Sequence, residues 1–143
     1  IVGFARAAEE AFATMVEREK RKRELQKLFF RRLLEEVPGI KITGVNPLEA
    51  SEEKRLSGNV HICIEGIEAE SLLLLDQKGI CASAGSACAS GSVEPSHVLL
   101  AMGKSHVEAY SGLRLSFEED LKEEELEFTV IAIKEGVERL RRE

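Results

Sequence analysis

Residues 59–83 read NVHICIEGIEAESLLLLDQKGICAS, and their hydrophobic pattern changes period partway along. The first residues alternate, with aliphatic side chains on one face and His61 and Cys63 on the other, as in a strand that buries one face. Residues 68–78 then predict a helix, which the glycine after them ends, and residues 80–83 predict a second short strand. Short strands that alternate irregularly with helices predict a small sheet with helices packed on one face, an α+β arrangement.

The sequence before this stretch predicts one long helix over residues 3–37, which Pro38-Gly39 cannot continue. Both ends of this helix carry apolar residues at helical spacing, whereas residues 17–24, EREKRKRE, are polar all round. This pattern predicts a strut with a solvated middle that links two packed bodies. Two helices with a break near Arg21 are the alternative. We expect the apolar residues of the first part to lack a partner within this chain; they are Phe4, Ala8, Phe12 and Met15.

The remaining elements follow from capping signals and alternation. We predict strands over 40–43 and 112–117, the second with clear alternation. A short helix should start at Pro95 or Ser96 and end before Gly103, and a helical turn capped by Ser105 and Glu108 should follow it. A final helix should open at Asp120 and Glu123 and run to about Arg141. Residues 1–37 would then form the long linking helix, and residues 38–143 would form a small domain.

Composition excludes several classes of protein. The 143 residues are 43% hydrophobic and 32% charged, with a net charge of −6, so nothing indicates a nucleic-acid-binding surface. No apolar run is long enough to cross a bilayer. Three cysteines without a CxxC pair predict neither a disulfide framework nor a zinc site. We therefore expect a cytoplasmic protein that binds neither membrane nor nucleic acid.

The clearest candidate for chemistry is Cys88. Residues 84–92 read AGSACASGS, with no side chain larger than that cysteine. Small side chains cannot anchor a loop by burial, and Gly85 and Gly91 leave its backbone free. We therefore expect the thiol to lie on a mobile loop. Such a loop suits a nucleophile that attacks a substrate at one position and transfers the group it has taken up at another. The alternative is that Cys88 is only a small residue in a flexible loop.

Other polar residues are weaker candidates. His61 and Cys63 share a strand face, but two ligands do not make a metal site, and no metal is predicted. We expect His106 to be solvated, and Cys81 to be a small buried residue in the strand before the loop.

Residues 83–103, SAGSACASGSVEPSHVLLAMG, resemble the active-site loop and following helix of the NifS/IscS-type cysteine desulfurases, a class V aminotransferase-like family. Residues 1–12, IVGFARAAEEAF, resemble the start of the helix that leaves the large domain in that family. Residues 55–80 resemble the strand and helix before the loop, and residues 112–116, GLRLS, resemble the strand after it.

The resemblance implies a fold-type-I pyridoxal-phosphate enzyme of which this sequence is the C-terminal, small-domain portion. It implies that Cys88 takes the sulfur of L-cysteine as a persulfide and leaves alanine. It implies that Arg114 binds the substrate carboxylate. The pattern agrees with that role, because Arg114 is the lone cation on the strand face opposite three apolar residues. The alternative is that Arg114 is an exposed strand residue without a function. His97, which could suggest a Cys/His hydrolase, falls in the packing helix after the loop.

The same resemblance places the cofactor lysine and the large domain upstream. No residue of this chain is therefore expected to hold the cofactor, and the piece alone is expected to be inactive. A homodimer and a protein that accepts the sulfur are also implied.

The sequence departs from the family in two places. Ala84 and Ala89 stand where Ser and Thr are common, which removes hydroxyl groups near the thiol. After Arg114-Leu115-Ser116 the family continues with glycine and a basic residue, whereas this chain has Phe117 and then the acids 118–120. We expect three acids near a carboxylate-binding site to oppose an anionic substrate.

Two other functions remain open. The first is a selenocysteine lyase or another class V aminotransferase-like enzyme, which the long form of the loop disfavours. The second is a non-enzymatic persulfide carrier or interaction module, which the unpartnered start of the first helix disfavours.

Overall fold

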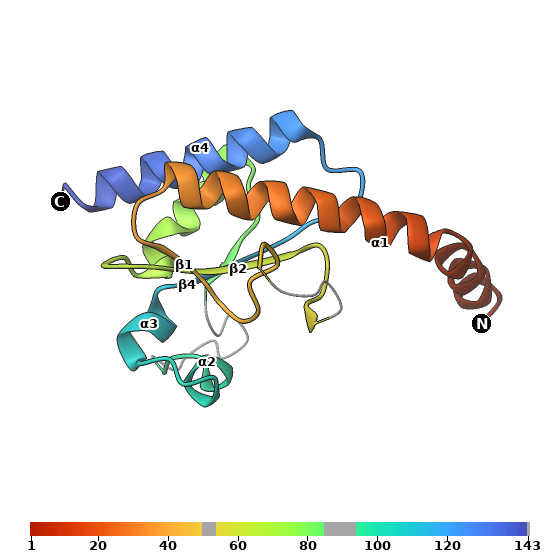
Figure 1. The fold of residues 1–143 in the computed structure, drawn as a ribbon, viewed down its shortest axis with the longest axis horizontal. Coiled ribbons are helices and arrows are strands. Elements are labelled where there is room, and N and C mark those ends of the chain that lie inside the picture. The colour runs from red at the N-terminus through yellow and green to blue at the C-terminus, as the bar shows by residue number, and fades with distance from the viewer. Residues whose placement is uncertain (50–53, 85–93, 143) are drawn as a thin grey trace.

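The computed structural model describes residues 1–49, 54–84 and 94–142, and its centre is a four-stranded antiparallel sheet (Figure 1). The strands are β1 (Ile40–Ile42), β2 (Asn59–Ile64), β3 (Ser83–Ala84) and β4 (Gly112–Ser116), in the spatial order β1-β2-β4-β3. The predicted alternation is confirmed, because Val60, Ile62 and Leu113 are fully buried whereas Arg114 is exposed.

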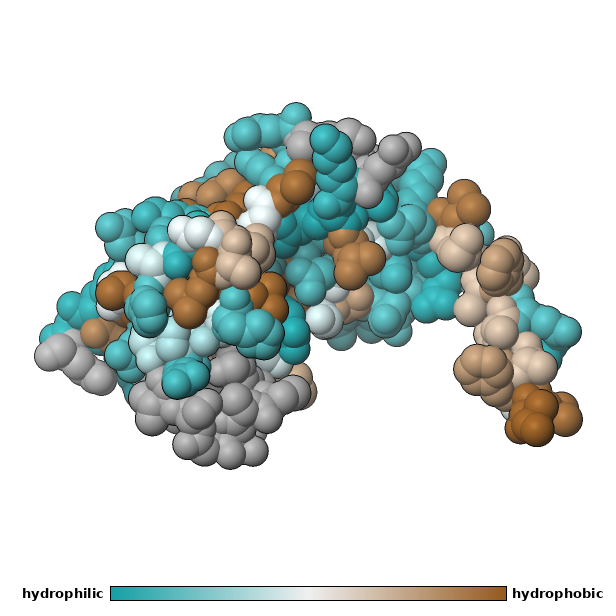
Figure 2. Space-filling model, turned by 90° about the horizontal axis from the view of Figure 1, so that it is seen from below, coloured by the Kyte–Doolittle hydropathy of each residue, from teal (hydrophilic) through white to brown (hydrophobic). Residues whose placement is uncertain are grey.

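Helix α1 runs without interruption from Val2 to Glu36, so the alternative of a break near Arg21 is wrong. Its second half packs on the sheet and buries Phe29, Phe30 and Leu33. Residues 1–17 are all exposed, and Figures 1 and 2 show this end of the helix projecting beyond the rest of the molecule. The expectation that its apolar residues lack a partner within the chain is therefore confirmed.

Helix α4 (Glu123–Leu140) lies beside α1, and the 3-10 helix η2 (Ala69–Lys78) packs against α4. Two hydrogen bonds of 2.7 Å join the Arg32 guanidinium of α1 to the Glu127 carboxylate of α4. The apolar faces of these elements close one continuous core over the sheet. The α+β architecture predicted from the sequence is confirmed.

Two short helices, α2 (His97–Ala101) and α3 (His106–Tyr110), lie on the opposite side of the sheet from α1 and α4 (Figure 1). Each buries one residue, Leu99 and Ala109 respectively. Helices α1, α4 and η2 thus cover one face of the sheet, as predicted, and the two short helices cover part of the other face. The capping box of Ser105 and Glu108 is confirmed at the start of α3.

Several predicted bounds are wrong. The strand expected over 80–83 is only Ser83–Ala84, because only these residues enter the register with β4. The last helix begins after Lys122, whose backbone N–H donates to the Glu125 carboxylate at 2.9 Å, rather than at a capping box of Asp120 and Glu123. None of the helices in the described ranges could span a membrane.

The middle of α1 is less solvated than predicted. Lys22 and Arg23 are half-buried, and one turn later Gln26 is fully buried. The Gln26 amide donates to the carbonyl oxygens of Leu56 and Asn59, both at 2.7 Å. The polar run therefore packs against the connection that leads into β2, which the local pattern of charges could not indicate.

Candidate functional site

Arg114 stands at the centre of the sheet face that is turned away from α1 and α4. Its register partners are His61 on β2 and Ser83 on β3, so these three residues form a row across three strands. The side chain is exposed, and it makes no hydrogen bond or ion pair with any other residue that the structure describes. A lone guanidinium on a strand is suited to binding an external carboxylate through two parallel hydrogen bonds.

His61 lies half-buried under the short helices. A methyl group on Gly112 would come within 3.1 Å of its Cε1 atom and 2.9 Å of Leu99 Cδ1 of α2. The imidazole and α2 thus both pack on the same glycine, two residues before Arg114. A larger residue at 112 would therefore require the imidazole ring and the Leu99 side chain to shift.

The electrostatic environment of His61 is positive. Burial, followed by the charges of Arg55 and Arg114, lowers the pKa of His61 from 6.5 to about 4. Its buried Nδ1 finds no hydrogen-bond partner within the described ranges. At neutral pH the imidazole is therefore uncharged and lies between two cations.

Arg55 is the second cation whose charge acts on His61, and it is held from several sides. Its guanidinium donates to the carbonyl oxygens of Thr43 at 2.7 Å and Val45 at 2.9 Å, and it stacks 4.7 Å from the centroid of the Phe30 ring. Burial lowers the pKa of Arg55. Since its two terminal nitrogens donate to backbone carbonyl oxygens, Arg55 contributes charge near His61, whereas Arg114 has no hydrogen-bond partner among the described residues.

Two acidic residues after β4 pair with basic side chains of α1. Glu118 pairs with Arg18 at 3.4 Å and with Lys22 at 3.5 Å, and Glu119 also pairs with Arg18. Hydrogen bonds, first from the backbone and then from Arg18, lower the pKa of Glu119. The expectation that these acids oppose an anion at Arg114 fails for Glu118 and Glu119, because basic side chains of α1 neutralise them.

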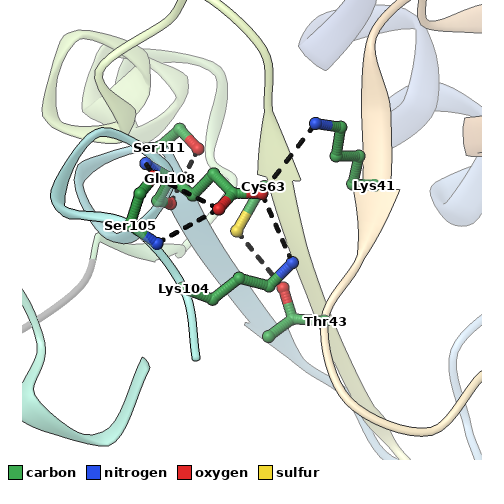
Figure 3. A network of polar contacts seen from close by, with 7 residues as sticks. All are labelled: Lys41, Thr43, Cys63, Lys104, Ser105, Glu108 and Ser111. Carbon is green, nitrogen blue, oxygen red and sulfur yellow. Dashed lines mark hydrogen bonds and ion pairs between the residues drawn. The ribbon is translucent and has the colours of Figure 1, made fainter. Parts of the chain in front are cut away.

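The structure separates the three cysteines. Cys88 lies outside the described residues, so its predicted exposure remains a prediction. Cys63 is buried, with its Sγ 3.3 Å from the Thr43 hydroxyl (Figure 3). Cys81 is exposed, so the expectation of a buried residue is wrong. The reason is that β3 begins only at Ser83, so no strand holds Cys81 against the core.

A polar network next to Cys63 anchors α3 to the sheet (Figure 3). The Glu108 carboxylate accepts a hydrogen bond from the Ser105 backbone and pairs with Lys41 of β1 at 3.8 Å and Lys104 at 3.6 Å. These hydrogen bonds and charges lower the pKa of Glu108. The network fixes α3 and uses no group of the Arg114 row.

The other histidines carry no site. His97 and His106 are both exposed first residues of their helices, which confirms a solvated His106. Over residues 1–49, 54–84 and 94–142 no cluster of three or more metal-ligating side chains occurs. Sequence reasoning missed Arg55 and the neutral His61. An antiparallel pairing of residues 59–64 with residues 112–116, inferred from their alternating patterns, could have placed His61 beside Arg114.

Comparison with known proteins assigns this chain to a family. Residues 1–128 match the family model for aminotransferase class-V, and the chain belongs to that family. It is 40% identical over 131 residues to the cysteine desulfurase IscS of Clostridium botulinum (strain Hall), an alignment that covers 91% of this chain and 32% of that protein. It is 37% identical over 142 residues to an IscS-like cysteine desulfurase of Mycobacterium tuberculosis, covering 99% of this chain and 35% of that protein.

Solved structures agree. A NifS-like protein from Rickettsia africae superposes with a TM-score of 0.77 at 25% identity, over 95% of this chain and 33% of that one. A second NifS-like protein gives a TM-score of 0.74 at 27% identity, over 94% of this chain and 32% of that one. The predicted resemblance is thus confirmed, and the chain spans about a third of the length of these relatives.

The family depends on pyridoxal phosphate, which a lysine side chain can hold through a covalent bond. No lysine in the described ranges is buried. Lys78, which lines a cavity of about 220 Å³ between η2 and α4, pairs with Glu135 at 2.5 Å. A lysine that forms a covalent bond with the cofactor needs a protected pocket and a readily lost proton. The described lysines therefore do not fit a covalent bond with the cofactor.

Proposed function

We propose that this chain is the cysteine-bearing portion of a cysteine desulfurase, with Cys88 as the sulfur-accepting residue. The observation that carries the proposal is the position of Arg114. Its guanidinium, which has no partner among the described residues, lies in register with Ser83, and the segment that carries Cys88 follows β3 along the chain. An amino acid whose carboxylate binds Arg114 would therefore lie beside the segment that carries the thiol.

The proposed chemistry balances without an external oxidant. The thiolate of Cys88 attacks the sulfur of L-cysteine, an S–S bond forms, and the C–S bond of the substrate breaks. The carbon receives the electron pair and a proton and becomes the methyl group of alanine, while Cys88 becomes a persulfide. The role of Arg114 is to hold the carboxylate so that the substrate sulfur is presented to the thiolate.

Pyridoxal phosphate, which withdraws electrons from the substrate in this family, would be held outside this chain. In this proposal residues 1–37 form a helix that links a cofactor-binding domain to the small domain of residues 38–143. The chain alone would then be inactive. The support is that relatives are about three times as long and that the described lysines do not fit the cofactor.

The proposal also includes the partners of the reaction. The persulfide would pass to an acceptor protein, in iron–sulfur cluster assembly or thiolation, and the intact enzyme would be a homodimer in the cytoplasm. A selenocysteine lyase of the same family is the second candidate, since Arg114 would bind the carboxylate of either amino acid. Turnover of L-cysteine against L-selenocysteine distinguishes the two.

Sulfur labelling tests the role of Cys88. In the intact enzyme, one turnover with labelled L-cysteine should place the label on Cys88, as located by peptide mapping. Cys88→Ser should abolish persulfide formation because a hydroxyl group does not accept the sulfur. Cys63→Ser and Cys81→Ser are the matched controls and should retain turnover. Label on Cys63 or Cys81, or parental sulfide release by Cys88→Ser, contradicts the proposal.

Kinetics test the role of Arg114. Arg114→Ala should raise KM for L-cysteine by about ten- to a hundredfold, because a charge-assisted hydrogen-bonded pair contributes roughly 1.5–3 kcal/mol. Arg21→Ala removes an exposed arginine of α1 and should leave KM unchanged. Equal KM values for parent and Arg114→Ala would exclude Arg114 from the site.

A further inference from the structure

The row across the sheet at Arg114 contains no carboxylate. Both register partners, His61 and Ser83, are neutral, in a chain with 26 acidic and 20 basic residues. Elsewhere several basic side chains have acidic partners: Arg18 pairs with Glu119, and Arg32 pairs with Glu127. Arg114, unlike these, has no counter-ion in the part of the chain that the structure describes.

The position opposite Arg114 is also the one best placed to neutralise it. Directly paired residues of antiparallel strands have Cβ atoms about 4.5–5.5 Å apart, and opposite charges there attract. The charged groups that act on His61 are Arg55 and Arg114, and no carboxylate is among them. Further along the same face, the carboxylate of Glu108 is engaged by Lys41 and Lys104. A carboxylate at position 61 would thus face Arg114 across the strand pair and would also feel the charge of Arg55.

We propose that His61 is a positioning residue for Arg114, whose uncharged imidazole leaves the guanidinium free to bind an external carboxylate. The ring is held in place because Leu99 of α2 and the imidazole both pack on Gly112. The low pKa of His61 keeps it neutral near pH 7. The inference rests on the proposed function in one respect: the external carboxylate is taken to be that of the amino-acid substrate.

The decisive experiment compares two substitutions of the same shape, His61→Asn and His61→Asp. In the intact enzyme, Asp should pair with Arg114 and raise KM for L-cysteine at least about tenfold, with kcat changed less than about twofold. His61→Asn should stay within about threefold of the parent KM. Equal KM values for the two variants would overturn the inference, because a role in packing alone does not distinguish Asn from Asp.

A second pair covers the case in which a charge at the half-buried position 61 prevents folding. Ser83 flanks Arg114 from the edge strand, so Ser83→Asp should weaken carboxylate binding where Ser83→Asn does not. The probe is sodium acetate, titrated against each variant and followed by the NMR signal of the Arg114 Nε–H group. Equal acetate affinity for Ser83→Asp and Ser83→Asn would contradict the inference that Arg114 binds an anion because no neighbouring carboxylate neutralises its charge.

The imidazole itself provides a readout that does not depend on catalysis. Saturating acetate should raise the NMR-measured pKa of His61, because the bound anion offsets the charge of Arg114, and Arg114→Gln should raise it without acetate. An unchanged pKa in both cases would overturn the inference. If the intact enzyme does not release sulfur from cysteine but acetate still binds His61→Asn more tightly than His61→Asp, the proposed function fails and the inference stands.

Discussion

At the scale of single residues, the cysteines differ in what surrounds their sulfur atoms. Cys63 is 1% exposed and its sulfur contacts the Thr43 hydroxyl at 3.3 Å. Cys81 is exposed beside an apolar groove of about 470 Å³ that Phe117 and Phe128 help to line. The two thiols are therefore expected to react differently, although the sequence places both near a strand.

Alkylation measures this difference. With iodoacetamide under native conditions, Cys81 should be modified at least about tenfold faster than Cys63, because the reagent reaches only an exposed thiolate. Unfolding in guanidinium chloride is the control and should equalise the two rates, which peptide mapping by mass spectrometry reports. Faster modification of Cys63 in the native protein would contradict the arrangement of the β1–β2 edge.

At the scale of elements, the junction of α1 with the sheet depends on one buried amide. Gln26 is 1% exposed, and its side chain donates to the backbone oxygens of Leu56 and Asn59, which lead into β2. The same strand carries His61 two residues later. The helix thus holds the start of β2 from the face opposite to the site.

Gln26→Met tests this junction. The change keeps the size of the side chain but removes the Gln26 donor of the Leu56 carbonyl group and the shorter of the two hydrogen bonds to the Asn59 carbonyl group, so the free energy of unfolding should fall by about 1–3 kcal/mol. Gln77→Met is the matched control on the exposed surface of η2, and it should change stability by less than about 0.5 kcal/mol. Urea unfolding followed by circular dichroism measures both, and equal stabilities would show that the amide is dispensable.

At the scale of the whole molecule, α1 divides into a packed half and a half that extends away from the core (Figure 1). Phe30 is fully buried, whereas Phe12 is 78% exposed. Figure 2 shows apolar side chains along the projecting end. An apolar helix face of this kind is stabilised only when another surface covers it.

Two phenylalanines of one helix provide the test. In the 143-residue chain, Phe30→Ala should lower the free energy of unfolding by about 3–5 kcal/mol, the usual result of emptying a core position. Phe12→Ala should change it by less than about 0.5 kcal/mol, because that ring is 78% exposed. Denaturant unfolding compares the two. A large loss for Phe12→Ala would mean that the projecting half of α1 is covered.

The elements with strong periodicity were predictable, and those with weak signals were not. Alternation identified β2 and β4, and the Ser105–Glu108 box identified the start of α3, because these signals lie within a few residues of one another. β3 was misplaced because its two residues are defined by pairing with β4 and not by their own pattern. The half-buried Lys22 was missed because its partner, Glu118, is distant in the sequence.

The sequence by itself determined the α+β class, the outward direction of Arg114 and the small-residue setting of Cys88, because each follows from local side-chain pattern. Only the tertiary structure decided that Arg114 lies between His61 and Ser83, and that Glu118 and Glu119 turn to α1. The physical reason is that strand register and ion pairing join residues far apart along the chain, so the charge around Arg114 depends on how the strands align.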